Sequence, residues 1–570
     1  MNNDQKFEFV SPRADVEIHL SNGEIISGPR GSTLEEFFSI YQENELAPIV
    51  GATVNGKLSE LSFPVTMEVD VHPITMEDAD GMRFYRRSLT FILETAFHDL
   101  HPDGILTVDH SVTSGGYFCQ VYRRSPLTSG ELKQLEGRMS ELVKEDIKFE
   151  RLKISLDEGI KYFNERGYKD KVRLLHHRKK DYLTLYKLGD HMDYHHGYMV
   201  PSTGYIKWFD LIMMNEGFIV RFPRRKNPTV LQQIPKYYTL LNVFQRYGGW
   251  LHRLGIDSVG ALNDSIDGDQ IRKLILVSEA LHEQHIAEIA AQIEERSGSI
   301  NVILIAGPSS SGKTTFSKRL TIQLLARGIS PFPMEMDKYF VDRDNTPVDE
   351  NGDWNFESLD AVNRKRLSKD LQRLIKGEAV QLASYDFQTG ISSEGETVQL
   401  RPGQIIILEG IHGLNPDLLP GFPQASTYKI YVSALTQLNL DRHNRVSTTD
   451  TRLIRRIVRD ARERGYTAME TINRWESVRR GEKQNIFPFQ DNADAMFNSA
   501  LVYEMAALKP LAEPVIRQVP HSAEARIEAK RLLAFLEWFL PLDINMIPDN
   551  SILREFIGES SLKDFNLWEQ

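Results

Sequence analysis

The sequence predicts a multidomain protein of the α/β class, whose larger C-terminal part contains a doubly wound parallel β-sheet. Two observations predict this class. From residue 300 onwards, short apolar segments such as NVILIAG and QIIILEG alternate with segments of helical periodicity, which is typical of βαβ units. The first of these apolar segments also runs directly into a glycine-rich loop and a helix. A length of 570 residues leaves room for roughly three to five domains.

The N-terminal half predicts two smaller α+β domains. Residues 1–75 contain a strand VEIHL, a hairpin turn at Asn22-Gly23, a helix that begins LEEFF after the capping residue Thr33, and a strand MEVDVHPI. Residues 76–226 show a mixed pattern, with helices expected near 87–99 and 129–145. We therefore expect one domain boundary close to residue 75.

The remaining chain predicts a connector, the α/β domain and an extension. Residues 227–298 look mostly helical, with apolar residues close to the 3.6-residue period over 271–293 and an end at Ser297-Gly298-Ser299. Residues 299–510 carry the alternating pattern. Residues 511–570 form a helical extension, with one amphipathic helix expected over 523–540 before Pro541.

Composition excludes several classes of protein. Hydrophobic residues make up 41% and charged residues 26%, which are ordinary values for a globular chain. The net charge of −11 argues against a uniformly basic nucleic-acid binder. The single cysteine, Cys119, cannot form an intrachain disulfide, and we expect neither a signal peptide nor a membrane-spanning segment. We therefore expect a cytoplasmic protein with no membrane partner.

The segment GPSSSGKT, residues 307–314, matches the phosphate-binding pattern G-x-x-x-x-G-K-[ST] between a strand and a helix. Glycines allow backbone N–H groups to surround phosphates, a lysine reaches the terminal phosphates, and a hydroxyl can ligate Mg²⁺. The sequence therefore predicts a site for ATP or GTP with Mg²⁺. The residues expected to bind the nucleotide are Gly307, Ser309, Ser310, Ser311, Gly312, Lys313, Thr314 and Thr315, with Thr314 also a metal ligand.

Two carboxylates follow predicted strands and should lie beside this loop. Asp337 comes directly after PFPMEM, and Glu409 follows QIIIL. Because the carboxyl ends of parallel strands meet at one sheet edge, both side chains should emerge near the phosphates. We expect Asp337 to be the catalytic base, assisted by Lys313, and Glu409 to be the second metal residue.

Eight arginines between residues 442 and 464 include Arg452, Arg455, Arg456 and Arg459, which share one helical face. Few acidic residues lie nearby in the sequence to pair with them. We therefore expect part of this helix to close over the triphosphate as a lid rather than to form a salt-bridged surface.

Over residues 300–508 the chain resembles the uridine kinase/phosphoribulokinase branch of the P-loop kinases. The resemblance rests on GPSSSGKTT, MDKYF, NFESLDA, YDF, ILEGIHGL and DTRLIRRIVRDARERG, in this order. It implies that Asp337 is the base, that Thr314 and Glu409 hold magnesium, that Arg452 contacts a ribose, and that Arg455, Arg456 and Arg459 belong to the lid. The substrate residues that it implies are Tyr339, Glu357, Tyr385 and Arg452.

Two departures from the family pattern leave the acceptor open. Uridine kinases have Asp-His-Pro where this chain has Glu357-Ser358-Leu359, and they have a His and an Arg after the YDF element, where this chain has Gln388 and Thr389. We expect a kinase that phosphorylates the 5′-hydroxyl of a pyrimidine nucleoside such as uridine or cytidine, in a homo-oligomer. The alternatives are a kinase for another sugar-like alcohol and a nucleotide-switched protein associated with RNA or the ribosome.

The N-terminal half resembles two modules of threonyl-tRNA synthetases. Residues 16–72 are similar to the TGS domain, a β-grasp module, and FYRRSLTFIL with DYHHGYMVPSTGYIKWFDL is similar to the editing domain that follows it. At the family's four imidazole or thiol positions this chain has Arg87, Phe91, His195 and Met199. We therefore expect no editing activity, since only one of these side chains can transfer a proton near neutral pH.

Two binding roles for the N-terminal half remain open. His176, His177, His191 and His196 lie near His195 in the sequence, which leaves a zinc site as the less favoured alternative to a conformational or binding role. Basic runs at 173–180 and 221–226, with tyrosines and Trp208 between them, are typical of RNA contacts but also of solvated basic surfaces.

Overall fold

The computed structural model describes residues 11, 13–41, 47–112, 115–233, 238–348, 352 and 354–565. Contacts between residues divide the chain into two compact units. Unit 1 consists of residues 1–169, 179–235 and 442–444, and unit 2 consists of residues 170–178, 236–441 and 445–570. In the part of the chain that is described, no helix has both the length and the apolar character needed to cross a bilayer.

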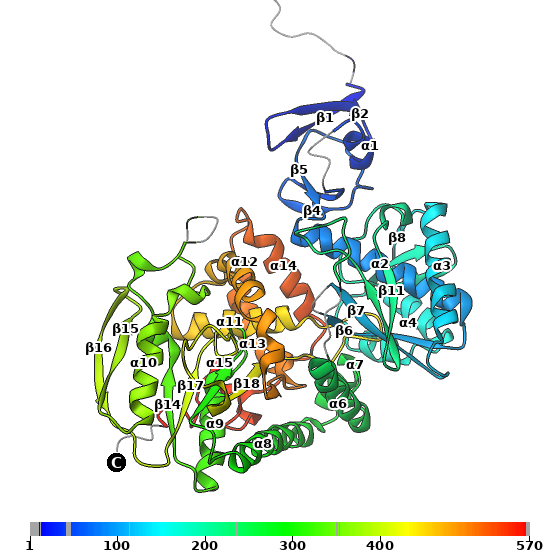
Figure 1. Ribbon diagram of the computed structural model, residues 1–570. Helices are drawn as coiled ribbons and strands as arrows, with labels where there is room; N and C mark the ends of the chain where they lie inside the picture. Colours follow the sequence, from blue (N-terminus) through cyan, green and yellow to red (C-terminus); the bar gives the residue numbers. More distant parts are fainter. Residues whose placement is uncertain are drawn as a thin grey trace, which may run out of the picture. The chain divides into compact units, whose positions relative to one another are not determined.

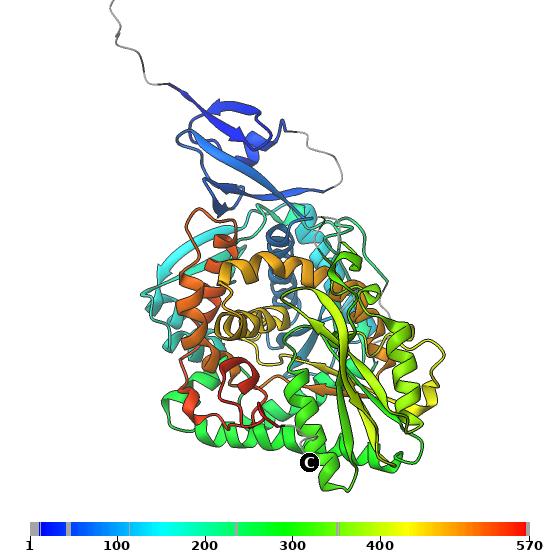
Figure 2. The ribbon, with the colours of Figure 1, turned by 90° about the vertical axis from the view of Figure 1, so that its left-hand side faces the viewer.

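Unit 1 begins with a β-grasp sheet, whose strands appear in blue in Figure 2. Its strand order is β2-β1-β5-β3-β4, with β1 and β5 parallel and the other neighbours antiparallel. Thr33 caps the helix, as the sequence predicted, and Glu36 completes a reciprocal capping box with it. The elements are β1 (Asp15–Leu20), β2 (Ile25–Pro29), α1 (Leu34–Phe38), β3 (Ile49–Val54), β4 (Lys57–Ser59) and β5 (Val69–Thr75).

The rest of unit 1 packs two antiparallel sheets around the long helix α2 (Ala79–Leu100), most of whose side chains are buried. The sheets have the orders β11-β12-β7-β6 and β10-β9-β8. Helix α3 coincides with the predicted range and is capped by Thr128 and Glu131. The elements are β6 (Ile105–Val112), β7 (Gly116–Tyr122), α3 (Ser129–Glu145), β8 (Glu150–Ser155), α4 (Leu156–Glu165), β9 (Tyr182–Leu188), β10 (His191–Asp193), β11 (Asp210–Met214) and β12 (Gly217–Arg221).

Unit 2 is built on a five-stranded parallel sheet of order β14-β17-β13-β18-β19 (Figure 1). All five residues of β13 are buried, which explains why the central strands read as continuous apolar runs. The predicted α/β class is therefore confirmed. The strands are β13 (Val302–Ala306), β14 (Pro331–Glu335), β17 (Ile405–Glu409), β18 (Thr427–Ser433) and β19 (Ala495–Asn498).

Helices and one antiparallel hairpin complete unit 2. The hairpin is formed by β15 (Val380–Asp386) and β16 (Ile391–Val398). The helices are α5 (Lys169–His176, all but its first residue in this unit), α6 (Tyr238–Leu254), α7 (Val259–Asp267), α8 (Ile271–Glu295), α9 (Lys313–Ala326), α10 (Arg364–Ile375), α11 (Thr448–Glu463), α12 (Ala468–Asn485), α13 (Glu504–Arg517), α14 (Ala525–Leu536) and α15 (Arg554–Ile557).

Helix α14 is shorter than the range 523–540 that the periodicity predicted. The backbone beyond it makes other hydrogen bonds. The carbonyl of Trp538 accepts from Asn263 at 2.8 Å, the carbonyl of Phe539 accepts from Lys509 at 2.5 Å, and the amide of Leu540 donates to Asn263 at 2.9 Å. Because these tertiary partners satisfy the backbone, the chain leaves the helix while its apolar side chains stay buried.

Candidate active site

The phosphate-binding loop connects β13 to α9, where the motif predicts it. A Cβ atom on Gly307 would lie 2.0 Å from the carbonyl oxygen of Val432 in the neighbouring strand, so only glycine fits at this position. Gly312 begins the helix with a φ of +85°, and Ser310 also has a positive φ, of +57°. The loop therefore has the curled backbone that directs N–H groups inward.

Thr314 and Glu409 meet at the mouth of this loop. The Thr314 hydroxyl is exposed and donates to Glu409 Oε1 at 2.8 Å. Surrounding protein raises the pKa of Glu409 to about 7, although Lys313 and the Thr314 hydrogen bond act in the opposite direction. A hydroxyl and a carboxylate in this position are hard oxygen ligands, so the pair fits a magnesium ion chemically.

Asp337 follows β14 at the same edge of the sheet. Its side chain reaches solvent, but the atoms around it limit its hydration and raise the pKa of the carboxyl. The charges of Lys313 and Arg464 act in the opposite direction, and Glu335 adds to the increase. The structure therefore brings Asp337 and Glu409 within the electrostatic reach of Lys313, as the positions of the two acids after their strands predicted.

Arg452 and Arg455 support the phosphate loop from within the protein. Arg452 is 1% exposed, donates to the carbonyl of Ser309 at 2.9 Å and pairs with Glu482. Arg455 is fully buried, pairs with Glu504 and donates to the carbonyl of Ser310 at 3.4 Å. The sequence-based roles were a ribose contact for Arg452 and a lid position for Arg455. In this structure both guanidinium groups are enclosed beneath the loop instead.

Arg456 and Arg459 lie further out on the same helix. Arg456 donates to the Ser309 hydroxyl at 3.0 Å, and both arginines contact the buried carboxylate of Asp460. Arg456 therefore lies against the loop, as a lid residue requires, and both side chains are partly exposed. They are partly neutralised by one shared acid.

Three acidic residues contact the site although they lie far from the phosphate-binding motif in the sequence, where no pattern marks them as part of it. Glu482 accepts from the Ser309 amide at 3.0 Å, and Glu504 pairs with Arg455. Glu555, on α15, accepts from both the amide and the hydroxyl of Thr315, at 3.1 and 3.0 Å. A phosphate that used the Thr315 donors would have to replace the Glu555 carboxylate, since both need the same two hydrogen atoms.

Aromatic residues of the hairpin pack against one another and against the segment that follows β14. Tyr385 and Phe387 from the hairpin have ring centroids 5.1 Å apart, and Phe340 packs against Tyr385 at 5.7 Å. Phe387 is 60% exposed, whereas Tyr385 is 7% exposed. Tyr339 lies in the core and donates to Asp370 at 3.2 Å, so its ring is a packing element here.

Glu357 is brought to the phosphate loop by its packing against α12. A Cβ atom on Gly481 would lie 2.3 Å from the Glu357 Cβ, so the helix approaches closely at this glycine. Burial raises the pKa of Glu357, and the charge of Arg456 lowers it. The carboxylate therefore lies close enough to α11 for the charge of Arg456 to act on it.

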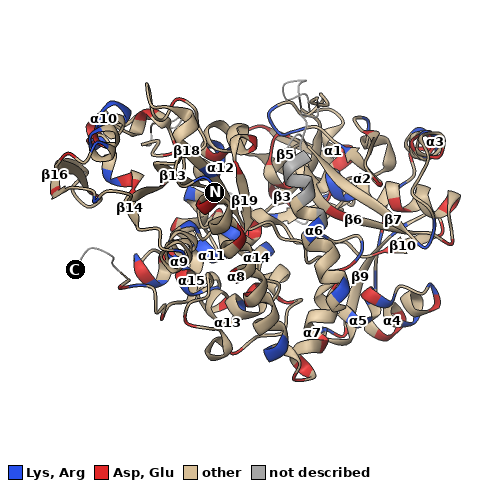
Figure 3. Cartoon of the chain, turned by 60° about the horizontal axis from the view of Figure 1, so that its bottom comes forward, with Lys and Arg blue, Asp and Glu red and all other residues tan. Residues whose placement is uncertain are grey.

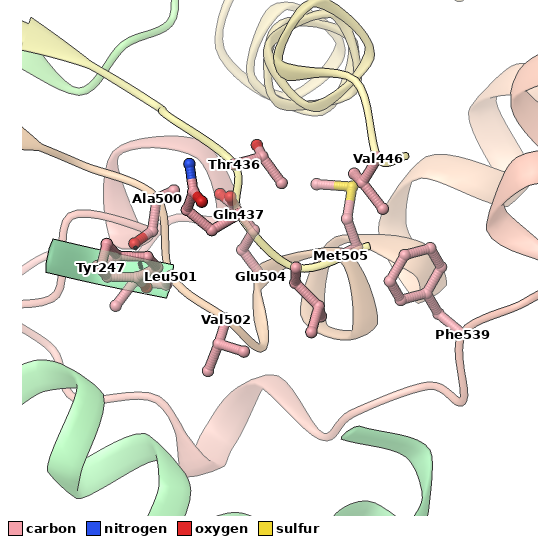
Figure 4. Close-up of a pocket in the computed structure, with 11 residues that line it drawn as sticks. Tyr247, Thr436, Gln437, Val446, Ala500, Leu501, Val502, Glu504, Met505 and Phe539 are labelled. Carbon is pink, nitrogen blue, oxygen red and sulfur yellow. Dashed lines mark hydrogen bonds between the residues drawn. The ribbon is translucent and has the colours of Figure 1, made fainter. Parts of the chain in front are cut away.

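A small pocket lies between the start of α13 and the loop that follows β18. Figure 4 shows Glu504 and Met505 of α13 facing the loop that carries Thr436 and Gln437. Tyr247 closes one side and donates to the carbonyl of Ala500 at 3.1 Å. Because Glu504 already pairs with Arg455, this pocket belongs to the support of the phosphate loop and not to its open side.

The four editing-like positions in unit 1 do not form a proton-transfer site. Arg87 lies against Gly197 and donates to the carbonyl of Tyr198 at 3.3 Å. Phe91 packs its ring against His195 with centroids 5.3 Å apart, and Met199 is buried. Of the other histidines near it in the sequence, His177, in unit 2, contacts Asp264 at 2.7 Å, whereas His191 packs against the same Phe91 ring with centroids 5.6 Å apart.

The basic runs are largely engaged within their own units. Arg173 pairs with Asp264 at 2.7 Å, Arg178 lies over the ring of Trp538, and Arg221 pairs with Asp210. Arg225 donates to the carbonyl of Glu77 at 2.6 Å. Figure 3 shows acidic and basic residues interspersed along the chain. This pairing weakens the argument for an RNA surface that the basic runs alone supplied.

The two halves of the chain match different known proteins. Residues 302–506 match the model of the Phosphoribulokinase / Uridine kinase family. Two solved structures are similar to part of the chain. One is a possible uridine kinase from Bacillus stearothermophilus, with 19% identity over 38% of this chain and 98% of that one and a TM-score of 0.26. The other is a proposed fructose transport system kinase from Silicibacter sp. TM1040, with 16% identity over 37% and 98% and a TM-score of 0.26.

The N-terminal region matches threonine–tRNA ligases. The enzyme of Clostridium kluyveri is 30% identical over 220 residues, which are 38% of this chain and 34% of that protein. The enzyme of Thermotoga petrophila is 29% identical over 205 residues, or 36% and 31%. The chain thus spans about a third of the length of these relatives. Residues 302–506 form a phosphoribulokinase/uridine kinase family domain, and the region before them is homologous to part of threonine–tRNA ligase.

Proposed function

We propose that this protein is a magnesium-dependent kinase that transfers a phosphoryl group from ATP or GTP to the 5′-hydroxyl of a pyrimidine nucleoside. The observation that carries the proposal is the convergence of Lys313, Asp337 and the Thr314–Glu409 pair at one edge of the parallel sheet. A protein that only binds nucleotides needs the loop and the metal ligands, but it does not need a carboxylate that can accept a proton from an acceptor.

The residues of the loop divide the work of phosphoryl transfer. Backbone N–H groups and Lys313 hold and polarise the triphosphate. Asp337 accepts the proton of the acceptor hydroxyl as its oxygen attacks the γ-phosphorus, and the bond from that phosphorus to the bridging oxygen breaks to release ADP or GDP. Thr314 and Glu409 would hold Mg²⁺, which, when bound, neutralises the charge of the phosphates. Arg456 and Arg459, from α11, would approach the same phosphates from outside.

A planar acceptor is supported by the aromatic residues of the hairpin. Phe387 offers a ring that is 60% exposed next to Tyr385, and Arg343 donates to the Phe387 carbonyl at 2.7 Å while lying over the exposed ring of Trp354. Exposed rings beside a basic group favour stacking with a nucleobase. Glu357 is the carboxylate available for the ribose hydroxyls, one methylene longer than the aspartate of the family pattern.

Nucleotide binding should depend strongly on Lys313. Removing its ammonium group in Lys313→Ala deletes a charge-assisted contact to the phosphates, so the affinity for ATP or GTP is expected to fall by about 10- to 100-fold. Isothermal titration calorimetry with a non-hydrolysable nucleotide measures this loss. Lys376→Ala removes an exposed lysine at the end of α10 and should bind as the unaltered protein does. Equal affinity in the two variants would contradict the assignment of the loop.

The acceptor is tested by measuring ADP or GDP release across nucleosides, sugars and small alcohols. We expect release above the acceptor-free rate with uridine and cytidine at millimolar concentration, and loss of this stimulation when Mg²⁺ is chelated. Stimulation by a sugar but not by either nucleoside would show that the acceptor is another alcohol. A protein that binds nucleotide tightly and releases none with any acceptor would instead favour a nucleotide-switched binding role.

A further inference from the structure

A buried group of carboxylates and imidazoles lies in unit 1, outside the kinase site. Glu94 is on α2, Asp193 is the last residue of β10, and His195 follows two residues later. His443 belongs to residues 442–444, which the contacts place in the same unit. The four side chains are between 0 and 5% exposed.

The ligand atoms of these residues face one another. Glu94 Oε2 lies 3.7 Å from His195 Nε2 and 3.2 Å from His443 Nδ1, and His443 Nδ1 lies 2.8 Å from Asp193 Oδ2. One ligand atom from each of Glu94, Asp193 and His195 lies within 4.8 Å of the others. In a tetrahedral zinc site with bonds of about 2.0–2.1 Å, neighbouring ligand atoms are about 3.3 Å apart. The observed separations scatter around this value.

A third imidazole occupies the same buried space. His191 is 6% exposed, and neither of its ring nitrogens has a hydrogen-bond partner among the described residues. Its Nε2 lies 4.0 Å from Glu94 Oε2. A buried imidazole without hydrogen bonds is costly, and two carboxylates buried together are costlier still unless a cation compensates their charge. One cation at the centre of the group would compensate the charge of the two carboxylates.

We propose that Glu94, Asp193, His195 and His443 bind one divalent transition-metal ion of the zinc class. Two imidazole nitrogens and two carboxylate oxygens suit Zn²⁺ and its neighbours, whereas Mg²⁺ and Ca²⁺ prefer oxygen ligands alone. Glu94 and His443 are not among the four positions of the editing pattern, where Arg87, Phe91 and Met199 cannot bind a metal in this way. Of the four proposed ligands, only His195 therefore belongs to the editing pattern.

The test uses the full chain, treated with chelator, dialysed and titrated with Zn²⁺. We expect binding of one Zn²⁺ per chain by calorimetry and by elemental analysis, together with a rise of several degrees in Tm. The variants Glu94→Gln, His195→Gln and His443→Gln should each weaken binding by more than about 100-fold, because each removes a direct ligand. His521→Asn changes an exposed histidine and should bind as the unaltered chain does.

Co²⁺ provides a spectroscopic test that does not depend on the variants. When Co²⁺ replaces Zn²⁺, four-coordinate binding is expected to give visible absorption bands that are displaced by Zn²⁺. If the chelated chain binds less than about a tenth of an equivalent of Zn²⁺ and its Tm does not change, the proposal is overturned. It is also overturned if folded His195→Gln and His443→Gln proteins bind Zn²⁺ as tightly as the unaltered chain, because the metal would then lie elsewhere.

Discussion

The Asp337→Asn protein is expected to turn over about 10²- to 10⁴-fold more slowly than the unaltered enzyme. Asparagine keeps the size and hydrogen bonding of the side chain, but it cannot accept the proton of the attacking hydroxyl. Nucleotide affinity should change little, since Lys313 and the loop amides remain. Steady-state kinetics with the best acceptor, combined with nucleotide titration, separates the loss of kcat from any loss of binding.

The pH profile gives a second reading of the same residue. Only the ionised carboxylate can act as the base, so kcat/KM should fall as pH decreases through the pKa of Asp337. Because the surrounding protein atoms limit the hydration of this carboxyl and raise its pKa above the ordinary value of 3.8, the decline should begin at a higher pH than for an unperturbed aspartate. The Asn variant should lack this decline.

Asp360→Asn, which alters an exposed carboxylate paired with Arg364, is the control for both measurements. Normal turnover in Asp337→Asn with loss in Asp360→Asn would move the base to Asp360.

Replacing Arg455 by Ala should destabilise unit 2 by about 3–5 kcal/mol. The change leaves the Glu504 carboxylate buried without its guanidinium partner and removes hydrogen bonds to the Ser499 and Ser310 carbonyls. Urea denaturation followed by near-UV circular dichroism measures the free energy of unfolding of the transition that contains unit 2.

Two further variants distinguish the loss of the buried Arg455–Glu504 pair from the loss of any arginine on α11. Arg462→Ala removes an exposed arginine of the same helix, paired with Glu463 at 2.8 Å, and should cost less than about 1 kcal/mol. The double variant Arg455→Met, Glu504→Met should be more stable than Arg455→Ala, because neither charge is then left alone. A similar small loss in Arg455→Ala and Arg462→Ala would mean that the buried pair contributes little.

The parts of the site that the sequence predicted lie within short segments or at strand ends. The loop from Gly307 to Thr314 is one contiguous motif, and Asp337 and Glu409 follow strands whose apolar runs identify them. The apolar pattern of each strand shows where it ends, and the carboxyl ends of parallel strands meet at one edge of the sheet. The positions of these residues could therefore be predicted from backbone geometry alone. The helix boundaries of α3 and the capping of α1 were predictable for the same local reason.

The roles of Arg452 and Arg455 depend on residues far along the chain. Only acids near them in the sequence could be counted as partners, and these suggested unpaired guanidinium groups. The structure instead supplies Glu482 and Glu504, 30 and 49 residues away. The histidine–carboxylate group shows the same limit more strongly, since His443 and Asp193 are 250 residues apart. Hydrophobic periodicity contains no information about a contact between residues so far apart in the sequence.

The bracing of the loop by Arg452 and Arg455 also determines how α11 can move. With both side chains bonded to loop carbonyls, the first turns of the helix and the loop form one rigid piece. A swing of this helix over the nucleotide therefore needs a pivot beyond these residues, and Gly465, with a φ of +67° just after the helix end, provides one. Glu482 bonds α12 to the same loop, so the part left free to move about this hinge is the segment 464–467 that joins the two helices. Enclosure of the triphosphate would then come mainly from that segment, which includes Arg464, and not from rotation of the arginines at the base of α11.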